Sequence, residues 1–237
     1  MESFVPAIQE ELRRKNYPLH RAAELTQITF GPELKSAVVK RWLFISKNAR
    51  TAVSISNNSV VLETTDYDTF DSFADRLAEV LEVVGRIAAV NIVDRLGLRF
   101  VDRIQPLSGE NLSDYLEQPL RGFTPASLSV SDIFQRHEYF CKTPQGMLMI
   151  RVFQPEDGVF LPPGLDPSDL EPRFPAASGR VTILDIDHFS EAQMDFASDP
   201  IVDAMWALHE HCDIAFRAAT TETARVSKWG AEAVVGD

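Results

Sequence analysis

Residues 93–104 read VDRLGLRFVDRI and alternate charged with apolar side chains over a length typical of a β-strand. The alternating set consists of Arg95, Arg99 and Arg103 against Leu96, Leu98, Phe100 and Ile104. Because successive side chains of a strand point to opposite faces, one face is apolar and the other carries the guanidinium groups. Residues four apart stand about 13 Å apart along a strand, so the arginines form a row. Such a strand requires a sheet with one face in a core and one polar face.

The composition predicts an ordered globular chain. Of 237 residues, 45% are hydrophobic and 24% are charged, which is close to the average for folded proteins. We expect one α+β domain over residues 1–237, with two loosely similar halves at 1–123 and 124–237. No run approaches the roughly 20 apolar residues of a membrane span, and the polar N-terminal segment lacks the apolar region of a signal peptide. A cytoplasmic location is therefore expected.

Cysteine content and net charge exclude several classes of protein. Cys141 and Cys212 are too few for a disulfide framework or a zinc cluster, and we interpret them as small apolar residues. The net charge of −12 argues against general nucleic-acid binding, which needs many cations acting together. An anion site, if present, must be local, so a small anionic ligand remains an open partner class.

The spacing of apolar residues predicts the secondary structure. A helix is expected over 6–16, followed by a long amphipathic helix over 68–89 that is capped by Asp68. Between these helices we expect a meander of strands, with a tight turn at Asn57-Asn58, over 25–30, 41–46, 51–56 and 60–65. After the arginine strand we expect a helix over 111–120, a hairpin of 127–142 with 147–154, a strand over 180–189 and a final helix over 200–227. A proline-rich loop joins 154 to 179. The predicted fold is a large, mainly antiparallel sheet with two long amphipathic helices on one face.

The arginine row has two interpretations that the sequence leaves open. Asp185 and Asp187 alternate with apolar residues on another strand and could pair with the arginines across the sheet. Alternatively, Arg95, Arg99 and Arg103 could line a recess for an anion, because forked guanidinium groups match phosphate oxygens.

Candidates for chemistry are sparse. Asp185 and Asp187 could hold a divalent metal as two carboxylates on one strand face, but no phosphate-binding glycine loop accompanies them. His209 and Asp213 share a helix face, yet the His-Glu-His-Cys-Asp run lacks the spacing of a zinc motif. No serine lies in a nucleophile elbow. Catalytic residues therefore stay unknown, and we expect no cofactor.

Four segments in this order resemble a sporadically distributed, uncharacterised family of bacterial and archaeal proteins of similar length. They are RWLFIS at 41–46, the YxxFxxF pattern beginning at Tyr67, RLGLRFVDRI at 95–104, and Leu208-His209 followed by Phe216. The resemblance implies no established catalytic residues, and a patchy distribution like that of defence or toxin–antitoxin genes. Family members usually open with a strand before the first helix, which is either missing here or lost to a mis-assigned start codon. A missing strand would leave a sheet edge unpaired.

These observations lead to two functional hypotheses of different classes. The first is a non-catalytic binding or interaction protein, an accessory or neutralising partner of another protein in a defence or toxin–antitoxin setting. The second is a metal-dependent nucleotide- or phosphometabolite-binding enzyme that uses the arginine row with Asp185 and Asp187. A homodimer is also expected, because an exposed apolar stripe and an open sheet edge would both favour association with a second chain. The stripe lies at positions 201, 205, 208, 212, 216 and 219.

Overall fold

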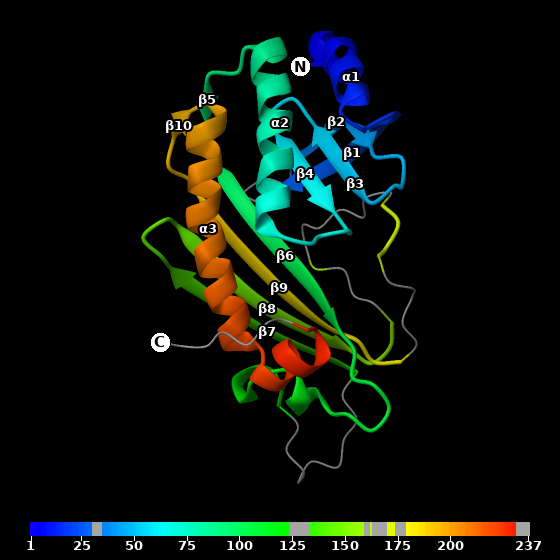
Figure 1. Ribbon diagram of the computed structural model, residues 1–237, viewed down its shortest axis with the longest axis vertical. Coiled ribbons are helices and arrows are strands. Elements are labelled where there is room, and N and C mark those ends of the chain that lie inside the picture. The colour runs from blue at the N-terminus through cyan, green and yellow to red at the C-terminus, as the bar shows by residue number, and fades with distance from the viewer. Residues whose placement is uncertain (30–34, 124–132, 159–161, 163–169, 174–178, 231–237) are drawn as a thin grey trace. The chain divides into compact units, whose positions relative to one another are not determined.

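A computed structural model confirms the α+β class and its antiparallel sheets (Figure 1). The structure describes residues 1–29, 35–123, 133–158, 162, 170–173 and 179–230. The strands in these residues form two four-stranded sheets and a two-stranded one. Contacts divide the chain into two compact units: unit 1 comprises Met1–Val93, Pro167–Pro175 and Met194–Val202, and unit 2 comprises Asp94–Asp166, Ala176–Gln193 and Asp203–Asp237. The expected single domain with two similar halves stays a prediction.

Unit 1 contains the expected meander. Sheet A has the order β1-β2-β3-β4, with β1 at Leu19–Thr29, β2 at Lys35–Ile45, β3 at Thr51–Ile55 and β4 at Val60–Thr64. A buried cluster of Leu43, Ile45 and Ala52 lies against it, with Leu170 packed on the cluster. A small sheet pairs β5 (Ile92–Val93) with β10 (Met194–Asp195). The strand-forming residues therefore build sheet A through local hairpins.

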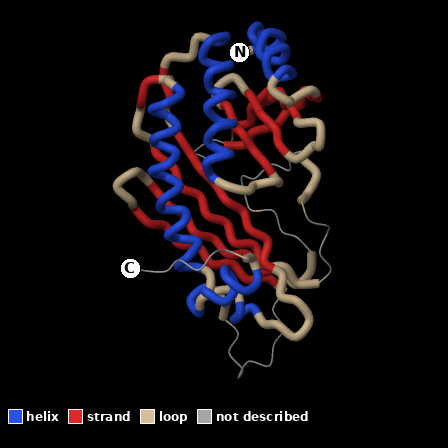
Figure 2. Tube along the Cα trace, viewed as in Figure 1, coloured by secondary structure: helices blue, strands red, loops and turns tan. Residues whose placement is uncertain are grey.

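Two helices complete unit 1 (Figure 2). α1 (Val5–Arg14) follows a 3-10 turn at Glu2–Phe4, and α2 spans Phe70–Ala88. The helices contact each other, and the apolar positions of α2 are buried at the three- and four-residue spacing expected of an amphipathic helix. The α2 cap is Thr69 and not Asp68, since the Thr69 hydroxyl accepts a hydrogen bond from the Ser72 backbone N–H. The helix ends where Ala89 adopts a positive φ of 48°.

Sheet C of unit 2 contains the arginine strand. Its order is β6-β9-β8-β7, all antiparallel, with β6 at Leu96–Ile104, β7 at Phe134–Lys142, β8 at Met147–Pro155 and β9 at Thr182–Ser190. β7 and β8 form a hairpin closed at Thr143 and Gly146, as predicted. The part of that hairpin predicted at 127–132, and most of the loop over 154–179, lie outside the described residues.

α3 (Ser198–Ala219) begins at the predicted Ser-Asp-Pro start and contributes residues from Asp203 onward to unit 2. Five positions of its apolar stripe are buried at 3% exposure or less: Ile201, Met205, Leu208, Cys212 and Ala219. The stripe belongs to the chain's own core, so it cannot be the dimer surface for which the sequence suggested it. A π-helical turn, η5 (Ala224–Lys228), follows α3.

Besides the α2 cap, further local predictions differ from the structure. The final helix, expected over 200–227, ends at Ala219. Residues 111–120 do not form one helix but two 3-10 turns, η2 (Leu112–Asp114) and η3 (Gln118–Leu120). A reciprocal capping box between Asn111 and Asp114 closes the first turn, and Pro119 has no N–H with which to continue a helix through the second. The hairpin turn at Asn57-Asn58 is present, but neither asparagine has a positive φ. The Ser56 hydroxyl, which contacts the side chains of Asn58 and Ser59, stabilises the turn instead.

Candidate functional site

The predicted site residues of the arginine strand and of β9 lie on one face of sheet C. In the register of β6 with β9, Arg99 is opposite Asp187 and Val101 is opposite Asp185. In the register of β8 with β9, Arg151 is opposite Asp185. Strand alternation therefore places Arg99, Asp185, Asp187 and Arg151 on the same side of the sheet.

Asp185 is the centre of this cluster. Its side chain is fully buried, and Arg99 donates hydrogen bonds from Nε to Oδ1 and from Nη2 to Oδ2, both at 2.8 Å. Arg151 approaches from the other side, with Nε 2.9 Å from Oδ2. Both carboxylate oxygens are thus held by guanidinium groups. The cross-strand pairing that the sequence suggested is present, with Asp185 as the main partner.

Arg151 was not predicted from the sequence to be a member of this cluster. Its side chain is only 7% exposed, and its Nη2 lies 3.6 Å from Oδ2 of Asp187. Neither Nε nor Nη2 has a hydrogen bond of good geometry among the described residues, so its stabilisation comes mainly from the nearby negative charges. A usable signal was present, because a single arginine within the apolar run MLMIRVFQ of a central strand requires a buried counter-charge.

Opposite charges in and around this cluster shift the pKa values of its carboxylates in opposite directions. Burial raises the pKa of Asp187, while Arg99, Arg151 and Arg95 lower that pKa and Asp185 raises it further. On the opposite face of β6, burial raises the pKa of Asp102 to about 6, and the negative charge of Asp185 adds to the effect. Two guanidinium groups thus lie against two carboxylates, an arrangement that leaves Asp185 little capacity to bind a metal.

Of the other two arginines of the row, Arg95 acts on this cluster through its charge, which lowers the pKa of Asp187. The guanidinium carbon of Arg95 lies 4.4 Å from the centroid of the Phe189 ring, in a cation–π contact. Arg103 is exposed and opposite Ile183, four residues along β6 from Arg99. The structure therefore pairs Arg99 directly with Asp185 and places it opposite Asp187 in the register.

Two histidines of unit 2, His188 and His209, have structural partners. His188 is fully buried, with Nδ1 2.9 Å from the carbonyl oxygen of Leu208 and Nε2 2.8 Å from the hydroxyl of Thr143. Desolvation lowers the pKa of His188. His209 contacts the rings of Phe100 and Trp206. No group of three or more His, Cys, Asp or Glu among the described residues is arranged to hold a metal ion.

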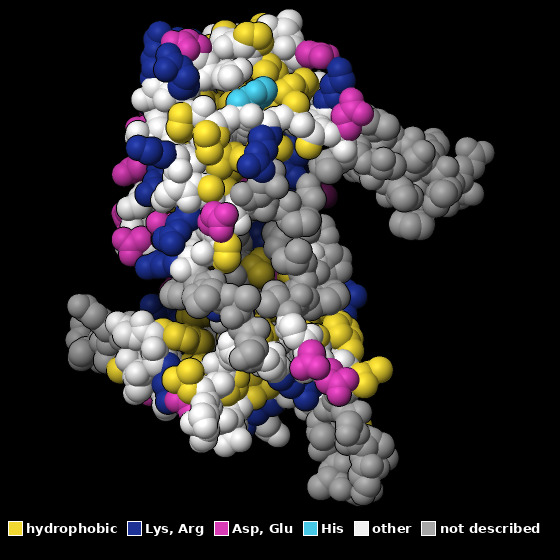
Figure 3. All heavy atoms as spheres, turned by 90° about the vertical axis from the view of Figure 1, so that its right-hand side faces the viewer, with side chains coloured by type: hydrophobic (Ala, Val, Ile, Leu, Met, Phe, Trp, Pro, Cys, Tyr) yellow, Lys and Arg dark blue, Asp and Glu magenta, His cyan; other side chains and the backbone are white. Residues whose placement is uncertain are grey.

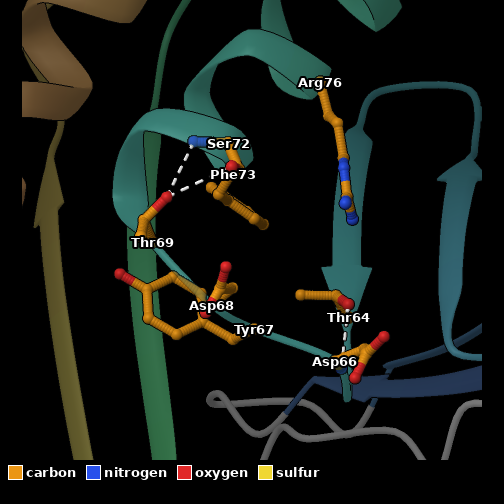
Figure 4. Close-up of a pocket in the computed structure, with 8 residues that line it drawn as sticks. All are labelled: Thr64, Asp66, Tyr67, Asp68, Thr69, Ser72, Phe73 and Arg76. Carbon is orange, nitrogen blue, oxygen red and sulfur yellow. Dashed lines mark hydrogen bonds between the residues drawn. The ribbon is translucent and has the colours of Figure 1, made fainter.

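Unit 1 has a recess that sequence reasoning missed. Figure 4 shows its inner end, at the start of α2, where the side chains of Arg76 and Thr64 approach Asp66. This end has room for about 10 Å³, roughly one water. The recess continues into a groove of about 690 Å³, which shares Asp66 and Arg76. The described residues that line the groove are Lys15, Asn16, Tyr17, Ser46, Lys47, Asn48, Thr51, Asp66, Arg76 and Glu79.

The groove combines paired and unpaired charges. Glu79 lies 3.5 Å from Lys15, and Asp66 lies 3.5 Å from Arg50, so both carboxylates have cationic neighbours. Lys47 and Arg76 are exposed, and neither forms a salt bridge with any described residue. The groove therefore offers two available cations in a chain whose net charge is −12. On the face drawn in Figure 3, basic and acidic side chains are interspersed among apolar ones.

None of the described helices is long and apolar enough to cross a membrane. No protein-family model, curated protein or solved structure matches the chain.

Proposed function

We propose that this chain is a non-catalytic binding protein and that its groove in unit 1 receives an acidic segment of a partner protein. The observation that carries the proposal is the pair of available cations, Lys47 and Arg76, in a groove of about 690 Å³. Lysine and arginine bind carboxylates through charge-assisted hydrogen bonds, and arginine can do so with two parallel bonds.

The lining of the groove favours a protein segment over a small metabolite. Small-molecule pockets are mostly apolar and bury most of the ligand. Five of the ten described lining residues of this groove carry a charge and two are asparagines, a composition like that of the polar rim of a protein interface. The described lining residues include no histidine or cysteine that could act as a base or nucleophile. We propose binding without catalysis as the function of this groove.

The cellular setting that we propose rests on the family resemblance. A cytoplasmic accessory or neutralising partner in a defence or toxin–antitoxin system agrees with the use of only two cysteines and with the family resemblance. The metal-dependent alternative has no specific observation in its favour among the described residues, because Arg99 and Arg151 occupy both oxygens of Asp185.

Affinity purification of three forms of the full chain, each co-expressed with its neighbouring genes, tests the proposal. The forms are the wild type, Arg76→Glu in the groove, and Arg217→Glu, a matched exposed helical arginine in unit 2. We expect a stoichiometric partner with the wild type and with Arg217→Glu, and loss of that partner with Arg76→Glu. Recovery of the chain alone in all three cases, or a partner insensitive to Arg76→Glu, would refute the proposal.

A further inference from the structure

The β7 edge of sheet C is exposed and rich in aromatic residues. β7 is the last strand in the order β6-β9-β8-β7, so among the described strands it pairs only with β8. Phe134, Tyr139 and Phe140 are 44%, 40% and 63% exposed. A long edge strand with apolar side chains is a template for pairing with another strand.

The backbone of β7 restricts the registers that an added strand can adopt. The Ile133 carbonyl accepts a hydrogen bond from the Glu156 N–H at 3.0 Å, and the Thr143 N–H donates to the Gly146 carbonyl at 2.9 Å. These pairs show that the odd-numbered residues of β7 turn their backbone groups toward β8. The even-numbered residues therefore turn their N–H and C=O groups toward the open edge. A second β7 can bond there only where even-numbered residues oppose even-numbered ones.

Charge selects one of these registers for an antiparallel pair of identical strands. When His137 lies on the two-fold axis, Arg136 is opposite Glu138 of the second copy and Phe134 is opposite Phe140, each twice. Opposite charges and aromatic pairs at facing positions stabilise a sheet. A shift of two residues in one direction sets Arg136 against Arg136, and in the other direction Glu138 against Glu138. Like charges directly opposite are destabilising, so both neighbouring registers are disfavoured.

We propose that the open edge of β7 is a self-association surface, on which a second copy of this chain pairs antiparallel about His137 and joins two four-stranded C sheets into one sheet of eight strands. The pairing forms on the order of eight backbone hydrogen bonds between the copies. The pairing uses residues of unit 2 only, whereas the proposed groove uses residues of unit 1. Failure of one proposal therefore leaves the other untouched. Two-fold dimers of this kind need only one self-complementary patch.

Charge-reversed variants test the register. Wild-type protein should have twice the 26.5 kDa mass of the chain in light scattering at micromolar concentration. Arg136→Glu and Glu138→Lys should each associate at least about tenfold more weakly, since each places like charges opposite one another twice. An equimolar mixture of these two variants restores opposite charges at every facing position, so it should form a heterodimer. A wild-type mass of 26.5 kDa at all concentrations, or no recovery in the mixture, would overturn the proposal.

Cysteine variants test the axis even if Glu138→Lys fails to fold beside Arg151. Directly opposite residues that do not exchange backbone hydrogen bonds have Cα atoms about 4.5 Å apart, within the range of a disulfide. In a Cys141→Ser background, His137→Cys should therefore cross-link under mild oxidation. Tyr139→Cys is the matched control, because its two copies would stand about 13 Å apart. Equal cross-linking of both variants, or none with His137→Cys, would refute the register.

Discussion

Replacement of Asp185 by asparagine tests whether the charged face of sheet C stabilises the fold as an ion-pair cluster. Asparagine has the same shape, so Asp185→Asn creates no cavity. It removes the negative charge between Arg99, bound through two hydrogen bonds of 2.8 Å, and Arg151, whose side chain is 7% exposed. Removing one partner of a buried ion pair costs about 3–5 kcal/mol, because the remaining charge is left buried.

That loss should be visible in both chemical and thermal unfolding. For a chain of this length, each kcal/mol shifts the melting temperature by about 2–4 °C, so Asp185→Asn should lower it by roughly 6–20 °C. Urea unfolding should show a lower midpoint with an unchanged slope. The control is Asp187→Asn. Burial raises the pKa of Asp187, and its nearest described contact with Arg151 is 3.6 Å, so we expect a loss below about 1 kcal/mol.

The comparison of the two variants decides the question. Equal losses for Asp185→Asn and Asp187→Asn, or a loss below about 1 kcal/mol for both, would refute the view that Asp185 holds the cluster together.

Three further outcomes follow from single residues. The pKa of Asp102 is raised from 3.8 to about 6, so the folded state retains a proton that the unfolded state loses, and the free energy of unfolding should fall as the pH rises from about 4 to 6. Asp102→Asn should remove this loss and add up to about 3 kcal/mol at pH 7.5, measured by urea unfolding. A variant with the same pH profile as the wild type would contradict this prediction. Cys212 is buried with a pKa raised to about 12 and Cys141 is exposed, so a thiol reagent should titrate one thiol in the native protein and two in denaturant; two fast native thiols would contradict the packing of α3. A Cβ at Gly146 would lie 2.0 Å from a backbone oxygen of β9, whereas a Cβ at Gly97 would make only ordinary van der Waals contacts. Gly146→Ala should therefore destabilise the protein by more than about 2 kcal/mol, and Gly97→Ala by less than half of that.

Elements built from local periodicity were predictable from the sequence. The apolar stripe of α2 and the alternation in β6 each contain enough residues to define a period, and both are observed. β9 does not alternate in burial, because its first five residues are all buried. The 111–120 segment shows where this reasoning fails, because ten residues with few apolar positions carry too little pattern to separate a helix from two capped turns. A hydrogen bond between Asn111 and Asp114 decides the outcome there.

The candidate sites were predictable only in part. Arg99, Asp185 and Asp187 could be predicted as site residues because each is a charged residue that alternates with apolar residues along its strand. Their pairing depends on the register between β6 and β9, which no local pattern reveals. The groove of unit 1 left no signal at all, since its lining comes from the turns after α1 and β2, the end of β4 and one face of α2. Such a surface exists only after the meander has brought these turns together.

The pairing of β6 with β9 also has a consequence during synthesis of the chain. Asp185 follows Arg99 by 86 positions, whereas β7 and β8 are joined by a short turn. The hairpin can close within microseconds of leaving the ribosome, but at about 5–20 residues per second β6 waits roughly 4–17 s for its partner strand. Until then Leu98 and Ile104, both buried in the finished sheet, have no strand to cover them. The nascent chain at this stage therefore exposes apolar side chains that the finished sheet buries.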